Sequence, residues 1–322
     1  MRFSVDPWDP TYGTSLDADL GASSAEVDPD VELPRARWRP LDPDPAVGRP
    51  EAVLFVDGVR RVDAQVWVDD EPAGSAAAPG LCASYAAGVV CCCPGEGAHL
   101  LAAHVKRGLF TTAAGATDVV TGAGTYSATA RVDPAGDAPP MQLLSQALQS
   151  RLAEVELLAA AAARAEHGLG QESGDDLLVV DGPLRGRQHL PRALGFVKSH
   201  RSDYLPAPLG AVVAELRAGC RTPIFRVGTS WERFTWYLRL PCPPGAPWAG
   251  VVRVECSAEL TVADAVALAT LSQATLVRFA STEYKDSRAP QNLYPIGGLE
   301  RALRRRLGEP ALLYRALRRA AA

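Results

Sequence analysis

The segment DLLVVDGPL, residues 176–184, decides the fold class of this chain. Its four central apolar residues are typical of a strand that is buried on both faces. Before it, residues 141–167 place leucine, valine and alanine side chains at helical spacing along one stripe, so we expect a long amphipathic helix there. Several strands, a long helix and then a central buried strand predict an α/β protein.

Further elements are expected on both sides of this segment. Residues 52–70 predict a strand, a turn at Asp57-Gly58 and a second strand. Residues 1–50 are rich in Asp-Pro pairs and predict an extended arm, which leaves residues 51–322 as one domain. The other expected strands are 80–93, 98–113, 222–227, 234–240 and 250–256, and the other expected helices are 207–219, 262–279, 297–307 and 310–320.

The composition limits how this chain can bind its partners. Hydrophobic residues make up 47% of it, enough for a large core, and its formal net charge is −4. Proteins held to nucleic acid by charge alone are usually basic, so DNA contact requires a local basic patch, metal ions or a partner. We expect a cytoplasmic protein without a membrane segment, because no signal peptide and no run of about 18 uncharged apolar residues is present.

Three of the seven cysteines are adjacent, at Cys91, Cys92 and Cys93. They follow Gly88-Val89-Val90, so we interpret the triplet as part of a buried strand in which cysteine acts as a small hydrophobe. No Cys-x-x-Cys pair occurs in the sequence, which argues against a zinc site.

Two apolar strands carry the same acidic ending, Asp57-Gly58 and Asp181-Gly182. A strand is a rigid platform, and two such strands side by side would bring both carboxylates within reach of one divalent cation. Hard oxygen ligands favour Mg²⁺ or Mn²⁺, which can activate water and stabilise charge on a scissile phosphate. The alternative is that each Asp-Gly pair is an ordinary turn.

The long helix offers a third acidic ligand. Glu156 lies nearer the centre of the apolar stripe than Glu154 does, and we therefore expect Glu156 at the margin of the core. The alternative is that both glutamates are solvated. Lys198, His200 and Arg201 form a basic cluster after a predicted strand, either to bind phosphates or as a solvated turn.

The order of these elements resembles the NurA family of nucleases over roughly residues 50–310. No single motif is very specific, and the resemblance depends on the order of several. The resembling segments are the strand ending in Asp57-Gly58, residues 151–156 (RLAEVE), the strand ending in Asp181-Gly182, residues 194–199 (LGFVKS), residues 236–240 (WYLRL), residues 250–255 (GVVRVE), and residues 292–295 (NLYP) followed by Leu299.

The resemblance implies an RNase H-like mixed sheet flanked by helices, with an extended N-terminal arm and a helical C-terminus. It implies a Mn²⁺-dependent (or Mg²⁺-dependent) deoxyribonuclease that acts on single-stranded DNA or DNA ends. It also implies a homodimer that docks on a hexameric HerA-type ATPase in DNA end processing. By position, Asp57, Glu156 and Asp181 would be the metal ligands and Lys198 would lie close to them.

Two departures from the family pattern matter. Val59 stands where family members have a small hydroxyl residue, and no histidine follows His200, although the family has one after its Tyr-Pro segment. In its place the candidates are Asn292, Asp286 or His200 itself. The alternative function is a catalytically inactive, NurA-like adaptor that binds and regulates the ATPase.

Overall fold

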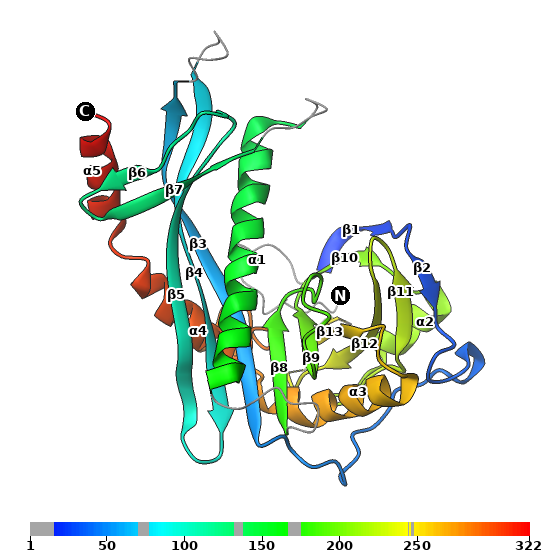
Figure 1. Cartoon of the computed structure of the whole chain (residues 1–322). Coiled ribbons are helices and arrows are strands. Elements are labelled where there is room, and N and C mark those ends of the chain that lie inside the picture. The colour runs from blue at the N-terminus through cyan, green and yellow to red at the C-terminus, as the bar shows by residue number, and fades with distance from the viewer. Residues whose placement is uncertain (1–15, 70–76, 132–137, 167–174, 244, 246–247) are drawn as a thin grey trace. The chain divides into compact units, whose positions relative to one another are not determined.

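The computed structural model of the chain describes residues 16–69, 77–131, 138–166, 175–243, 245 and 248–322. It shows a mixed α/β protein with a large mixed sheet flanked by helices, which confirms the predicted class at that level (Figure 1). The chain divides into two compact units. Unit 1 comprises the described residues of 1–55, 91–99 and 168–297, and unit 2 those of 56–90, 100–167 and 298–322.

Unit 1 is built on a mixed sheet. Its strands, in spatial order, are β2 (Glu26–Asp28), β11 (Phe225–Gly228), β12 (Glu232–Arg239), β13 (Val251–Ser257), β9 (Ala193–Val197), β8 (Asp176–Asp181) and the beginning of β3 (Ala52–Val68). β8 and β9 pair in parallel. The pairs β9–β13, β13–β12, β12–β11 and β11–β2 are antiparallel. A separate parallel pair joins β1 (Leu16–Ala22) to β10 (His200–Asp203).

Helices cover both faces of this sheet. α3 (Val262–Leu276), followed by a 3-10 turn to Phe279, packs on β8, β9, β12 and β13 (Figure 1). On the opposite face, α2 (Ala207–Ala214) and Trp38 pack on Phe225 and Tyr237. Among the described residues, Val262–Phe279 is the one helical segment that is long and apolar enough to cross a membrane. In this structure it supplies Ala265, Leu268, Ala269 and Leu276 to the core.

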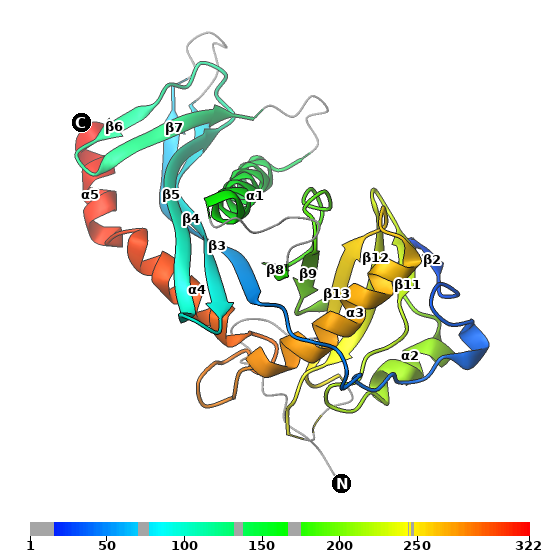
Figure 2. The same cartoon turned by 60° about the horizontal axis from the view of Figure 1, so that its bottom comes forward.

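Unit 2 continues from β3 into a second set of strands, in the order β3, β4 (Ala78–Cys93), β5 (Gly97–Thr111), β7 (Gly124–Ala130) and β6 (Val119–Thr121). The long helix α1 (Pro140–Glu166) lies on one face of β3–β5, while α4 (Tyr294–Arg306) and α5 (Pro310–Ala320) lie on the other (Figures 1 and 2).

The alternation of side chains along β4 explains why helices pack on both faces of these strands. Leu81, Ala83 and Tyr85 of β4 pack with α1. On the other face of β4, a Cβ added to Gly88 would lie 3.2 Å from atoms of Leu299 and of Leu303 in α4. Side chains one residue apart in β4 therefore contact different helices, as the two-residue period of a strand requires.

Most predicted elements are present, although the strand predicted at 222–227 begins at Phe225. The turn predicted at Asp57-Gly58 is wrong, because β3 runs through this pair as one strand of 17 residues. The helix predicted at 207–219 ends at Ala214. Of residues 1–50, the described part contains the extended strands β1 and β2 and a 3-10 turn at Arg35–Arg37, and contacts place it with unit 1.

Candidate functional site

Asp57 lies in the middle of β3 on the face that α4 covers. Its side chain is buried, and its nearest carboxylate oxygen lies within 4.8 Å of a carboxylate oxygen of Glu300 in α4. Asp57 Oδ1 also accepts a hydrogen bond from the backbone N–H of Gly58 at 2.7 Å. Sequence reasoning did not single out Glu300, although it is the one acidic residue in an otherwise arginine-rich helix.

Glu156 approaches β3 from the opposite face. A Cβ added to Gly58 would lie 2.5 Å from Glu156 Oε1 and 2.7 Å from Leu152 Cδ1, so Gly58 leaves the space that α1 occupies. Because neighbouring residues of a strand face opposite sides, Asp57 points away from Glu156. The structure thus brings Glu300 to Asp57 and does not bring the predicted ligand Glu156 there.

The burial of the two helix glutamates agrees with the helical spacing. Glu156 is 6% exposed, whereas Glu154 lies at the surface and forms an ion pair of 2.8 Å with Arg151. The expected position of Glu156 at the margin of the core is therefore confirmed, but that margin belongs to the face of the sheet that α1 covers.

Asp181 ends β8 in unit 1 and is held by a chain of polar side chains. Lys198 Nζ donates to Asp181 Oδ2 at 2.6 Å and to Asn292 Oδ1 at 2.9 Å. Asn292 Nδ2 in turn donates to Asp286 Oδ2 at 2.9 Å. Asp181 Oδ1 is buried and has no hydrogen-bond partner among the described residues. The predicted closeness of Lys198 to Asp181 is confirmed.

Two buried arginines lie in the same part of unit 1. Arg253 lines a cavity of about 330 Å³ together with Asp181 and Lys198. Glu255, which is fully buried, pairs with Arg253 at 2.6 Å and with Arg233 at 3.3 Å.

The position of Glu255 depends on its neighbours in the sheet. Glu255 Oε1 accepts the backbone N–H of Leu184 at 2.7 Å, and a Cβ added to Gly195 would lie 2.8 Å from Glu255 Cγ. The sequence pattern contained Gly195, Arg253 and Glu255, but it gave no sign that they would form one buried cluster.

His200 does not have the predicted phosphate-binding role in this structure. Its side chain is 5% exposed, contacts the Val251 carbonyl through Nε2 at 3.1 Å and packs against the rings of Tyr237 and Trp248. Burial lowers the pKa of His200 to about 4, so its ring is neutral at pH 7 and offers no positive charge. The predicted contact through Arg201 concerns a side chain outside the described residues.

Among the residues considered in place of the absent histidine, Asn292 and Asp286 join the polar chain that ends at Asp181. His200 instead packs against the rings of Tyr237 and Trp248.

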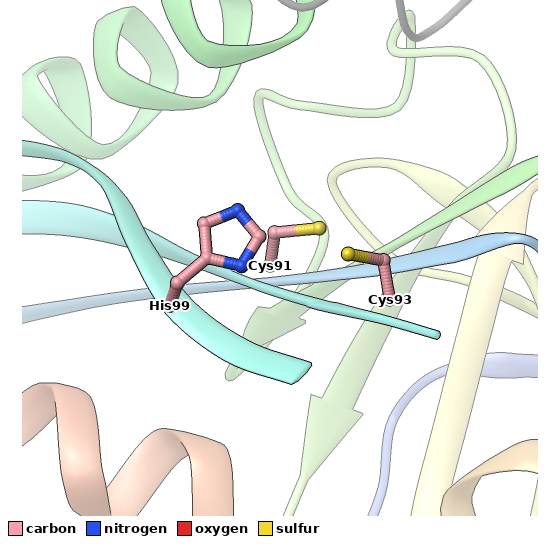
Figure 3. Close-up of side chains that lie close together, drawn as sticks. All are labelled: Cys91, Cys93 and His99. Atoms are coloured by element: carbon pink, nitrogen blue, oxygen red, sulfur yellow. The ribbon is translucent and has the colours of Figure 1, made fainter. Parts of the chain in front are cut away.

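Acidic groups, and one group of cysteine and histidine, could hold a metal ion among the residues that the structure describes. The cysteine and histidine group consists of Cys91, Cys93 and His99, near the turn between β4 and β5 (Figure 3). Cys91 is buried, as the sequence suggested for the whole triplet, but Cys92 and Cys93 are only half-buried.

No known family model matches this chain, and no curated protein matches it in sequence. The NurA resemblance therefore stays a prediction. The candidate function follows from the side chains described above.

Proposed function

We propose that this chain is a divalent-metal-dependent DNA nuclease whose acidic ligands are Asp181 in unit 1 and the pair Asp57 and Glu300 in unit 2. All three supply carboxylate oxygens, the ligands that Mn²⁺ and Mg²⁺ prefer. The set differs from the one implied by the family resemblance in a single member, with Glu300 in place of Glu156.

Strand register gives the two aspartates equivalent positions in their strands. The N–H of Ala52 donates to the carbonyl of Asp175 at 3.3 Å, where β3 and β8 both begin, and these strands are neighbours in the sheet. Strands that meet at their first residues can stay side by side only if they run in parallel. In that register Ala52 lies opposite Asp176, and Asp57 and Asp181 each follow by five residues.

Strand parity supports the same conclusion. Val53 and Phe55 of β3 share one core cluster with Leu177 and Val179 of β8. Residues two apart in a strand face the same side, so the next members of these two series, Asp57 and Asp181, face that side as well.

The polar groups around Asp181 fit a bound cation, and this observation carries the proposal. A buried carboxylate oxygen without a hydrogen bond is costly, and Asp181 Oδ1 is in that state while Lys198 satisfies only Oδ2. A divalent ion held there would supply water activation and charge stabilisation at a scissile phosphate.

Lys198 and Arg253 would position the phosphate. Both line the cavity that Asp181 also lines, where Lys198 pairs with Asp181 and Arg253 pairs with Glu255. A guanidinium can bind two phosphate oxygens at once, whereas an ammonium acts as a point charge.

The wider part of the proposal rests on the NurA resemblance. It comprises the RNase H-like fold, the homodimer, the HerA-type ATPase partner, the cytoplasmic location and the role in DNA end processing. Copurification of the chain with a HerA-type ATPase, followed by measurement of the mass of the complex, tests the partnership directly.

The nuclease assay compares variants of the carboxylates on single-stranded DNA and on duplex ends with Mn²⁺ or Mg²⁺. We expect Asp57→Asn, Asp181→Asn and Glu300→Gln to lower the cleavage rate by roughly 100-fold or more, since even outer-shell partners of a metal contribute about 10–100-fold. Glu154→Gln is the matched surface control and should keep full activity. Folded Glu156→Gln should also keep activity, because its carboxylate lies on the other face of β3.

Full activity of both aspartate variants would overturn the proposal. The adaptor alternative predicts neither cleavage nor Mn²⁺ binding in calorimetry by the unaltered chain. RNA and hybrid substrates in the same assay determine which sugar the enzyme accepts.

A further inference from the structure

A second group of metal-ligating side chains lies at the end of the β4–β5 hairpin. Cys91 and Cys93 are two residues apart at the end of β4, and His99 follows the turn at the beginning of β5. The two thiols point toward one another and the imidazole lies beside Cys91 (Figure 3). One ligand atom from each residue lies within 4.8 Å of the other two.

Alternation along β4 separates these two cysteines from the third. Cys91 and Cys93 share one face of the strand, and Cys92, which faces the other way, packs against the core of unit 1. The triplet therefore turns Cys91 and Cys93 toward His99 and Cys92 toward the opposite face of the strand.

We propose that Cys91, Cys93 and His99 form a zinc-binding site that is chemically distinct from the acidic residues. Thiolate sulfur and imidazole nitrogen are the ligands of tetrahedral zinc, with bonds of about 2.3 Å and 2.0–2.1 Å, which place the ligand atoms roughly 3.5–4 Å apart. Ligand atoms that already lie within 4.8 Å need only small side-chain movements to reach this geometry.

Strand geometry favours a shared ion over a disulfide between the two cysteines. Residues two apart in an extended strand have Cα atoms separated by roughly 6.4–6.8 Å, at the upper limit of disulfide spacing. An ion between the sulfurs widens the allowed separation. The absence of a Cys-x-x-Cys pair argued against zinc at the level of sequence, but the hairpin supplies the third ligand from the neighbouring strand.

The turn supplies the remaining contacts of the histidine. Nε2 of His99 lies 3.4 Å from Glu96 Oε2, and its Nδ1 lies 3.3 Å from the Gly97 carbonyl oxygen. Whichever nitrogen binds the ion, the other keeps an oxygen partner that orients the ring. Residues 94–98 are exposed, so water or the Glu96 carboxylate can complete the four ligands.

Metal titration of the full chain tests this site. After removal of metal under reducing conditions, the chain is titrated with zinc against a chromophoric chelator, and with cobalt as a spectroscopic probe. We expect one zinc per chain, together with the thiolate-to-cobalt charge-transfer absorption of a tetrahedral site. Both signals should be lost in Cys91→Ser, Cys93→Ser and His99→Ala.

Cys92→Ser is the matched control, because it removes the adjacent thiol on the opposite face and should keep the zinc. Glu96→Gln should weaken zinc binding by about 10–100-fold if the carboxylate orients His99. The double variant of Asp57→Asn and Asp181→Asn should bind zinc normally, so failure of the nuclease proposal would not mimic failure of this one.

Three results would overturn the zinc site. They are a reduced, folded chain that binds no zinc, unchanged zinc binding in the double variant of Cys91→Ser and Cys93→Ser, and a Cys91–Cys93 disulfide detected by peptide mass in the freshly purified protein. His99→Ala keeps the test valid if a cysteine variant fails to fold, because this half-buried ring can be removed without altering the strand that carries the thiols.

Discussion

Replacing Gly58 by alanine tests the packing of α1 on β3. The new methyl group would lie 2.5 Å from Glu156 Oε1, 2.7 Å from Leu152 Cδ1 and 3.0 Å from Leu152 Cγ. The glutamate oxygen ends a flexible chain, but Leu152 is 3% exposed and belongs to the buried cluster between α1 and β4. Overpacking of this kind costs about 1–3 kcal/mol, and the lower chain entropy of alanine offsets about 0.5–1 kcal/mol, so we expect a net loss of about 1–2 kcal/mol.

Denaturant unfolding followed by circular dichroism measures this loss. Gly298→Ala is the control within unit 2, since nothing lies within 4 Å of its added Cβ and alanine favours a helix by about 0.5–1 kcal/mol. If the clash is with Leu152, then Gly58→Ala combined with Leu152→Ala should cost about 1 kcal/mol less than the sum of the single variants. A Gly58→Ala chain as stable as the unaltered one, or strictly additive losses, would refute the reasoning.

Two further predictions concern buried charge in unit 1. The pKa of His200 in the folded chain, about 4, lies below its ordinary value of 6.5. The neutral ring therefore contributes fully to the free energy of unfolding above pH 6.5. As the pH falls toward 4 this contribution is lost, by about 3 kcal/mol. Unfolding free energies measured across this window should fall less steeply for His200→Gln, and equal slopes would contradict the burial effect. Glu255→Gln removes the carboxylate that pairs with Arg253 and Arg233. It should lower the free energy of unfolding, measured with denaturant, by about 3–5 kcal/mol. A decrease below about 1 kcal/mol would count against this network.

The two Asp-Gly pairs show what local sequence can and cannot predict. Gly182 adopts a positive φ of 101°, and β8 ends there because Pro183 cannot donate to a sheet ladder. Gly58 does not have a positive φ, and β3 continues past it as far as Val68. Proline after the second pair distinguished a real turn from an extended strand, and the sequence contained that difference.

The candidate site was predictable on the strands and not on the helices. An apolar strand that reaches a carboxylate indicates both position and face, so Asp57 and Asp181 could be chosen from sequence alone. The apolar stripe of α1 correctly placed Glu156 near the core, but a stripe does not say which face of a sheet the helix will cover. Glu300 is separated from Asp57 by more than two hundred residues, and only the packing of α4 on β3 and β4 brings it there.

The two proposed sites select their metals by ligand hardness. In the proposed acidic site Glu300 would supply a third carboxylate, and such hard oxygen ligands suit Mn²⁺ or Mg²⁺. Cys91 and Cys93 instead make the hairpin site soft, and soft thiolates prefer zinc to either of those ions. On the two proposals together, one chain would hold a soft ion at the hairpin and a hard ion among the carboxylates.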